Sequence, residues 1–233
     1  MPPTLPLRHE LKFQINTGEY LVLSRLLDTL LRRDPHGDAF NEYRIRSLYF
    51  DTPFDDALYE KLEGVPDRAK YRIRIYNNSD AFIRLECKRK IYDLINKEAL
   101  TISRELAEQL IARDAGGLLR TGEPLLHQMF AQLTASQLRP VVIVDYVREA
   151  YLHPAEEVRV TFDKQLRTAL GSIALFDPFV PLIDPFPDTT IILEVKFNRV
   201  LPGFIAGVLN GIRGVRQAIS KYTICRSFEN YTT

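Results

Sequence analysis

The amino-acid sequence predicts an α+β fold in which a mainly antiparallel β-sheet is flanked by helices. Two observations predict it. Several segments alternate polar and apolar residues with a period of two, the pattern of a strand that buries one face. The segments between them carry helical patterns, yet strands and helices do not alternate strictly as they do in parallel α/β proteins. We therefore expect most strands to pair with antiparallel neighbours.

Seven segments have the strand pattern, five of them cleanly and two less regularly. In residues 70–76, three basic residues share one face of the strand and three apolar or aromatic residues share the other. Such alternation predicts one face packed against helices and one face that is charged. The predicted strands cover residues 8–15, 43–50, 70–76, 82–90, 141–151, 158–163 and 191–197.

Helices are predicted from capping residues and apolar stripes. Thr17 can cap a helix with a leucine stripe, and Pro53 opens a short helix that Gly64 closes. The last predicted helix contains four glycines, which weaken it. A proline-rich segment, residues 176–188, predicts an extended loop. The predicted helices cover residues 17–33, 53–64, 103–113, 123–135 and 202–222.

The composition limits the class of protein. The chain has 233 residues, 45% of them hydrophobic, which suffices for the core of one domain over residues 1–233. The formal net charge of +1 argues against a general nucleic-acid binder. Two cysteines, no signal-peptide pattern and no bilayer-spanning apolar run predict a cytoplasmic protein. Membrane attachment would then require a membrane-protein partner.

The polar faces of the predicted strands repeat Arg, Lys and Glu at every second position. A charged strand face usually points to water, and that alternative stays open. If the sheet closes into a barrel, these faces instead share one interior. Like charges inside a barrel are costly unless a ligand neutralises them, and a linear polyphosphate would do so. The glutamates among them suit Mg²⁺ or Mn²⁺, which take oxygen ligands.

An ordered set of motifs resembles the VTC domain, the polyphosphate polymerase domain of the triphosphate tunnel (CYTH-like) superfamily. The motifs are RHELKF, SLYFDTPFDDALYEKLEG, KYRIRIY, LECKRK followed by INKE, DYVREAY, EVRVTFD, LEVKF and SKY, between about residues 8 and 222. The resemblance implies an antiparallel barrel tunnel of about eight strands. It also implies that the terminal phosphate of ATP is transferred to a growing polyphosphate chain, with Mn²⁺ or Mg²⁺ as cofactor.

The resemblance assigns roles to individual residues. It implies that Glu194 binds the metal ion. The residues implied to act on the reacting phosphoryl groups are Arg72, Arg74, Arg148, Arg159 and Lys196. The residues implied to bind the phosphate chain are Lys12, Lys88, Lys97, Ser220 and Lys221.

One departure from related hydrolases bears on the reaction. Hydrolytic tunnel enzymes usually begin with ExExK, whereas here the three positions are Arg8, Glu10 and Lys12. Losing the first carboxylate removes a possible ligand for a second metal, which favours transfer over hydrolysis. Two alternatives remain: a metal-dependent inorganic triphosphatase, or a non-catalytic module that binds polyphosphate or inositol phosphates. Glu194 argues against the binding module, because anion binding alone has no need of a carboxylate.

Overall fold

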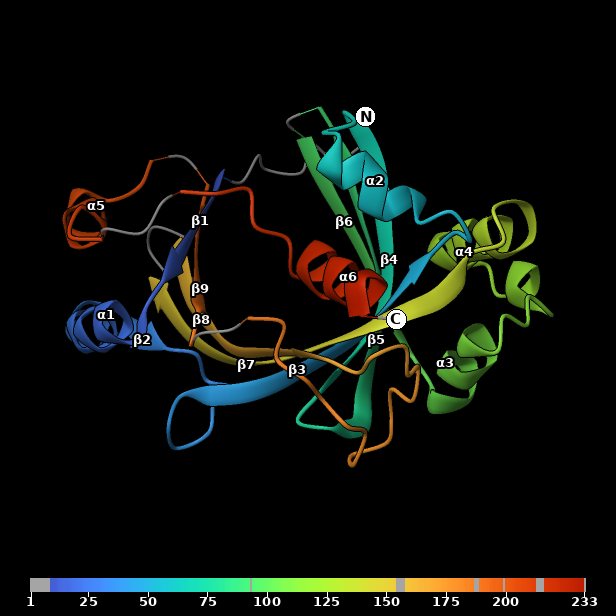
Figure 1. Ribbon diagram of the computed structural model, residues 1–233, viewed down its shortest axis with the longest axis horizontal. Helices are drawn as coiled ribbons and strands as arrows, with labels where there is room; N and C mark the ends of the chain where they lie inside the picture. The colour runs from blue at the N-terminus through green and yellow to red at the C-terminus, as the bar shows by residue number, and fades with distance from the viewer. Residues whose placement is uncertain are drawn as a thin grey trace. The chain divides into compact units, whose positions relative to one another are not determined.

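A computed structural model describes residues 9–92, 94–153, 158–186, 189–198, 200–212 and 216–232, and it confirms the α+β fold (Figure 1). Nine strands form one sheet with the hydrogen-bonded order β1-β9-β8-β7-β3-β4-β5-β6, and β2 pairs with β7. The strand pairs used below are all antiparallel. Over the described residues the order has two ends, β1 and β6, so the strands do not form a closed hydrogen-bonded ring.

The chain forms two compact units, and each is described by itself. Unit 1 comprises Met1–Arg44, Tyr146–Leu166 and Phe186–Ser220. Unit 2 comprises Ile45–Asp145, Arg167–Pro185 and Lys221–Thr233. Three of the five boundaries between the units fall within strands β3, β7 and β8.

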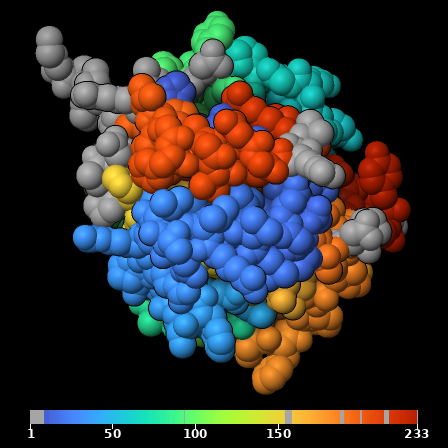
Figure 2. Space-filling view, turned by 90° about the vertical axis from the view of Figure 1, so that its left-hand side faces the viewer, coloured from blue at the N-terminus to red at the C-terminus, as the bar shows by residue number. Residues whose placement is uncertain are grey.

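In unit 1, two helices cover the apolar face of β1, β8 and β9. Helix α1 begins with a capping box, in which Asn16 and Glu19 each accept a hydrogen bond from the other's backbone N–H. The apolar residues of α1 and α5 pack against alternate residues of the strands, and Figure 2 shows both helices side by side, α1 in blue and α5 in orange. The charged strand faces therefore point away from α1 and α5. The elements are β1 (His9–Ile15), α1 (Thr17–Leu30), β2 (Arg32–Arg33), β7 (Arg139–His153), β8 (Val158–Thr168), β9 (Ile191–Phe197) and α5 (Gly203–Leu209).

In unit 2, the consecutive strands β4, β5 and β6 form an antiparallel meander. Apolar residues such as Ile73 and Leu85 pack against Leu110 of α3 and Met129 of α4. Because side chains alternate along a strand, the basic residues between them lie on the opposite face. The elements are β3 (Glu42–Asp51), α2 (Asp56–Leu62), β4 (Asp67–Tyr76), β5 (Ser79–Ile91), β6 (Leu94–Ile102), α3 (Arg104–Ile111), η1 (Leu118–Arg120), α4 (Pro124–Ala135) and α6 (Lys221–Thr232).

Two predicted helices were wrong in extent, two strands were missed, and one predicted strand falls partly outside the described residues. The helix predicted over residues 17–33 is capped by Asn16 instead of Thr17 and ends at Leu30, and Arg32–Arg33 form the unpredicted strand β2. Residues 202–222 do not form one helix, because α5 ends at Leu209 and α6 begins only at Lys221. Each glycine in a helix interior costs about 1 kcal/mol relative to alanine, and this segment contains four. Strand β6 was not predicted at all. Arg8 lies outside the described residues.

No helix in the part of the chain that the structure describes combines the length and the apolar character needed to cross a bilayer.

Candidate functional site

In unit 2, three cations converge on one buried carboxylate, forming a group that we call the Glu86 cluster (Arg72, Arg74, Glu86 and Lys97). The Glu86 carboxylate accepts hydrogen bonds from Arg72 Nε and Lys97 Nζ, both at 2.7 Å, and Arg74 Nη1 lies 3.7 Å from it. Register explains the arrangement, because Arg72 stands directly opposite Glu86 in the β4–β5 pair. Only 3% of the Glu86 side chain is exposed, so the cluster is not an open solvent face.

Hydroxyl groups on β3 fix the two arginines of this cluster. Arg72 Nη1 donates to the Tyr49 hydroxyl at 2.6 Å, and Arg74 Nε donates to the Ser47 hydroxyl at 3.1 Å. Both hydroxyl residues stand opposite their arginine in the β3–β4 pair. Burial disfavours the Glu86 carboxylate, but the neighbouring cations outweigh burial and hold its pKa well below the usual range. The Glu86 carboxylate is therefore ionised, and both arginines are positioned before any ligand binds. Burial lowers the pKa of Lys97, the third cation of the cluster.

A lysine row, defined as Lys70, Lys88 and Lys97, runs across β4, β5 and β6. Lys70 stands opposite Lys88, and Lys88 stands opposite Lys97. Lys70 Nζ also lies over the Tyr222 ring, 4.4 Å from its centroid. The resemblance did not assign Lys70, although the period-two pattern places it on the same face as Arg72 and Arg74. That pattern was the signal that could have identified it.

Asp51, the last residue of β3, connects two helices of unit 2. Its carboxylate accepts hydrogen bonds from the backbone N–H groups of Ala57 (2.9 Å) and Leu58 (3.2 Å), so it caps α2. It also accepts a hydrogen bond from the Tyr222 hydroxyl of α6. Lys221 is the first residue of α6 and is half-buried. Asp51 thereby fixes the helical turn that carries this predicted phosphate-binding residue.

In unit 1, two lysines and two glutamates form the Glu194 cluster (Glu10, Lys12, Glu194 and Lys196). Lys12 Nζ lies 3.1 Å from Glu10 Oε1 and 3.3 Å from Glu194 Oε2. Lys196 Nζ contacts Glu194 and lies 3.9 Å from Glu10 Oε1. Antiparallel register between β1 and β9 produces the set, with Lys12 opposite Glu194 and Glu10 opposite Lys196. Only 6% of the Glu194 side chain is exposed.

Lys12 anchors the Glu194 cluster through its charge and through one further contact. Burial works against the charge on Lys12, but Glu194 and Glu10 outweigh it and raise its pKa. Lys12 Nζ also donates to the Ile219 carbonyl oxygen at 3.2 Å. The predicted residue Ser220 follows directly and is half-buried, and its role stays a prediction.

The two predicted arginines of unit 1 are held by aspartates that sequence analysis did not name. Arg148 Nε and Nη2 donate to the two oxygens of Asp163, at 2.6 and 2.8 Å. Arg159 Nη2 donates to Asp34 Oδ2 at 2.6 Å and to the Tyr43 hydroxyl at 2.8 Å. Burial lowers the pKa of Arg148, but Asp163 outweighs it, and the pKa is raised overall. Asp163 lies on the same face of β8 as Arg159, so the period-two pattern could have identified it. Asp34 belongs to no such pattern.

The acidic residues of unit 1 fit a metal ion that is shared with phosphate. Mg²⁺ and Mn²⁺ at phosphate sites usually take one or two carboxylates and complete their shell with water and phosphate oxygens. Glu10 and Glu194 contact the same two lysines from neighbouring strands, which provides such a pair. In the described ranges, no group of three or more His, Cys, Asp or Glu side chains could hold a metal by itself. These two carboxylates therefore suit a metal ion that also binds phosphate oxygens, and not an ion bound by protein side chains alone.

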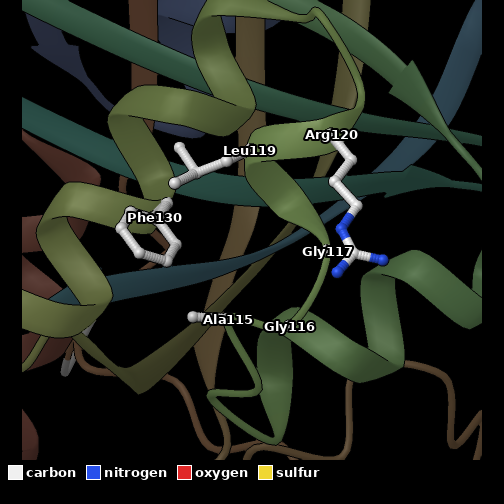
Figure 3. A pocket seen from close by; sticks show the side chains of 6 residues that line it. All are labelled: Ala115, Gly116, Gly117, Leu119, Arg120 and Phe130. Carbon is white, nitrogen blue, oxygen red and sulfur yellow. The ribbon is translucent and has the colours of Figure 1, made fainter.

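An open hollow of about 360 Å³ in unit 2 lies apart from this chemistry (Figure 3). Most of its lining is apolar, and none of the predicted site residues lines it. The lining offers an anionic ligand a single guanidinium group, that of Arg120, and no cluster of basic side chains. The lining residues are Ala115, Gly116, Gly117, Leu119, Arg120 and Phe130.

The structure thus groups the predicted residues within each unit. It brings Arg72, Arg74 and Lys97 together around Glu86, with Lys88 in the adjoining row. It brings Lys12 and Lys196 together with Glu194. The prediction that the charged faces of all strands share one interior stays a prediction.

Comparisons with known proteins identify the family. No curated protein matches the sequence. Among solved structures, a candidate adenylate cyclase from Bacillus halodurans is similar, with 13% sequence identity, coverage of 88% of this chain and 86% of that chain, and a TM-score of 0.48. The model of the VTC domain matches residues 7–229, almost the whole chain. The protein therefore belongs to the VTC domain family.

Proposed function

We propose that this protein is a polyphosphate polymerase that transfers the terminal phosphate of ATP to a growing polyphosphate chain. The observation that carries the proposal is the Glu86 cluster, where three largely fixed cations share one buried carboxylate. Arg72 and Arg74 are largely buried, so the positive charge that Glu86 leaves unbalanced is costly in the absence of a ligand, and a polyanion would offset that cost. Membership of the VTC domain family supports polyphosphate as the polyanion.

The basic residues would act by positioning and by charge neutralisation, which dominate phosphoryl transfer. Arg72 and Arg74 are held by hydroxyls of β3, so they can grip phosphate oxygens with little reorganisation. Arginine presents a planar fork that suits two oxygens of one phosphoryl group. The acceptor, the end of a phosphate chain, is already an anion, so the transfer requires no general base.

Glu194, together with Glu10, would hold Mn²⁺ or Mg²⁺. When bound, such an ion offsets the negative charge that develops on the transferred phosphoryl group. Lys12 and Lys196 hold both carboxylates in place by ion pairs, and carboxylate oxygens are ligands that Mg²⁺ and Mn²⁺ accept. Arg148 and Arg159, each fixed by an aspartate, would orient the phosphates of ATP.

The proposal is tested by incubating the purified protein with ATP and Mn²⁺ or Mg²⁺ and resolving long phosphate chains on a gel. We expect chain growth that depends on both ATP and metal, and that EDTA abolishes. Release of orthophosphate from tripolyphosphate without chain growth would show a triphosphatase instead. Tight tripolyphosphate binding without any turnover would show a binding module.

We further infer that residues 1–233 act as one domain in the cytoplasm, with ATP and polyphosphate as ligands. Both cysteines, Cys87 and Cys225, are buried free thiols, which fits a reducing compartment. Attachment to a membrane would come from a membrane-protein partner.

A further inference from the structure

Lys70 occupies a crowded position among cations of unit 2. It shares a strand face with Arg72, and it stands directly opposite Lys88 in the β4–β5 pair. Directly opposed residues on neighbouring strands have Cβ atoms about 5 Å apart, and like charges at such positions destabilise the pair. Lys97 continues the row on β6.

Charged and titratable groups face Lys70 from each element packed around it. Three of them oppose its positive charge: Lys61 from α2, Arg68 from β4 itself and Lys88 from β5. Asp51 at the end of β3 favours the charge, and the Tyr222 ring of α6 lies over the ammonium group.

The carboxylate that favours the charge is shared with other donors. Asp51 accepts hydrogen bonds from the backbone N–H groups of Thr52, Ala57 and Leu58 and from the Tyr222 hydroxyl. Its negative charge is therefore spread over a helix N-terminus as well as Lys70. Burial, together with the surrounding cations, lowers the pKa of Lys70 to about 7.

This environment changes when an anion arrives. At neutral pH, Lys70 can relieve the crowding by giving up its proton, which the neighbouring arginines cannot do. A phosphoryl group beside it reverses the balance, because its negative oxygens favour the ammonium form. The amine then takes a proton from solvent, and the Tyr222 ring, over which the Lys70 nitrogen lies, stabilises the resulting cation.

We propose that Lys70 is a further phosphate-binding residue, and that it takes up a proton when a polyphosphate chain binds. The ligand class rests on the proposed function, but the proton uptake is specific to Lys70. Polyphosphate affinity is then coupled to pH, and binding strengthens as the pH falls from 8 towards 6.

Proton uptake is measured by calorimetric titration of the protein with tripolyphosphate at pH 8 in two buffers that differ in ionisation enthalpy. Lys70→Arg is the matched variant, because it keeps the positive charge but does not titrate. Tripolyphosphate exchanges protons of its own, so the difference between wild type and variant is the informative quantity. We expect wild type to take up about 0.5 to 1 proton more than Lys70→Arg, and Lys70→Arg to bind up to about tenfold more tightly at pH 8 because its side chain has no proton to take up.

Two further variants complete the test. Lys70→Met should weaken tripolyphosphate binding about tenfold at pH 6, where Lys70 is charged even before the ligand binds. Lys90→Met, on the neighbouring strand β5, should leave proton uptake unchanged. Equal proton uptake by wild type and Lys70→Arg would overturn the inference about Lys70 and leave the proposed function standing. Failure of wild type to bind tripolyphosphate at all would overturn both.

A second measurement needs no ligand and also guards against misfolded variants. The pKa of Lys70 is lower in the folded protein than the ordinary value of 10.5, so the unfolded chain binds more protons between pH 7 and 10.5. Stability of the free protein should therefore rise with pH across this window, and Lys70→Met should flatten the rise. An unchanged slope in Lys70→Met would count against the inference.

Discussion

The Glu194 cluster of unit 1 and the Glu86 cluster of unit 2 both combine basic side chains with a buried glutamate on neighbouring strands, but they differ in charge balance. The Glu194 cluster has two lysines for two glutamates. The Glu86 cluster has three cations for one glutamate, and the lysine row adds more. A balanced cluster can exchange a lysine for a metal ion, whereas a cationic cluster calls for an anion. The same strand alternation therefore supports two different kinds of site.

The arginines of the two units differ in the same sense. Those of unit 2 are positioned by neutral hydroxyls, on Tyr49 and Ser47, as well as by Glu86. Those of unit 1 are each clamped by an aspartate. Arg72 and Arg74 share the single carboxylate of Glu86, whereas Arg148 and Arg159 each have an aspartate of their own, so the arginines of unit 2 retain more attraction for phosphate.

The largest effect that tests this comparison is expected from a substitution of Glu86. Glu86→Gln leaves three cations without their carboxylate, and we expect unfolding free energy to fall by about 3–5 kcal/mol at pH 7 in urea titrations. Glu10→Gln, in the balanced cluster, should cost about 1 kcal/mol or less because Glu194 still contacts both lysines. Equal losses in the two variants would contradict the comparison.

The same residue predicts a pH dependence. The pKa of Glu86 is lower in the folded protein than its ordinary value of 4.5, so its contribution to stability is present above that pH. The contribution is lost as the pH falls below 4.5. Glu86→Gln should therefore show a shallower loss of stability in acid than wild type, in unfolding measurements between pH 6 and about pH 3.

Glu194→Gln sharpens the comparison through catalysis. It should lower metal-dependent chain synthesis by about 100-fold or more, because it removes the buried carboxylate that would hold the ion. Tripolyphosphate binding in metal-free buffer should stay within about threefold of wild type, since the cations of unit 2 are untouched. The exposed Glu105→Gln on α3 is the control. Normal synthesis by Glu194→Gln would remove the metal role from unit 1.

Arg72→Gln tests the anion role of unit 2. Loss of a fixed guanidinium should raise the dissociation constant of tripolyphosphate about 10- to 30-fold, measured by calorimetry. Arg89→Gln is the matched control, because Arg89 is exposed and paired with Asp67 on the same two strands. A comparable loss in both variants would point to a general charge effect instead of a defined site.

Lys97→Met should have the smallest effect. Its side chain is 47% exposed, so solvent screens its charge more than that of Arg72. We expect tripolyphosphate binding to weaken by about two- to fourfold, and this difference to shrink in 0.5 M salt. A loss as large as that of Arg72→Gln would show that the exposure of a cation does not determine how much it contributes to tripolyphosphate binding.

Much of the sheet was predictable because its strands bury one face. All seven predicted strands are present, although residue 8 lies outside the described chain. Strand β6 escaped because its sequence, LINKEALTI, lacks clean alternation and is rich in helix-forming residues. It was assembled by pairing with β5, which no local pattern reveals. Lys97 was nonetheless predicted, through the motif that resembles the VTC domain.

The partners of the site residues were harder to predict than the residues themselves. Glu86 lies near Arg72 only because of the register between β4 and β5, and register depends on the whole sheet. Asp34 is far from Arg159 in sequence and shares no pattern with it. The C-terminal helix was misjudged because its glycines were treated as weakening one helix, whereas α5 contains Gly203 and Gly207 and ends at Leu209, well before α6 begins at Lys221.

Asp51 gives unit 2 a mechanical property that neither of its two helices has alone. Its carboxylate holds the start of α2 and the first turn of α6 at once. Loss of either contact leaves a buried acceptor or donor unsatisfied, so the two helices are expected to open together as one cooperative segment. A ligand that steadied the Lys221 turn would then also slow the opening of α2, with no contact to that helix.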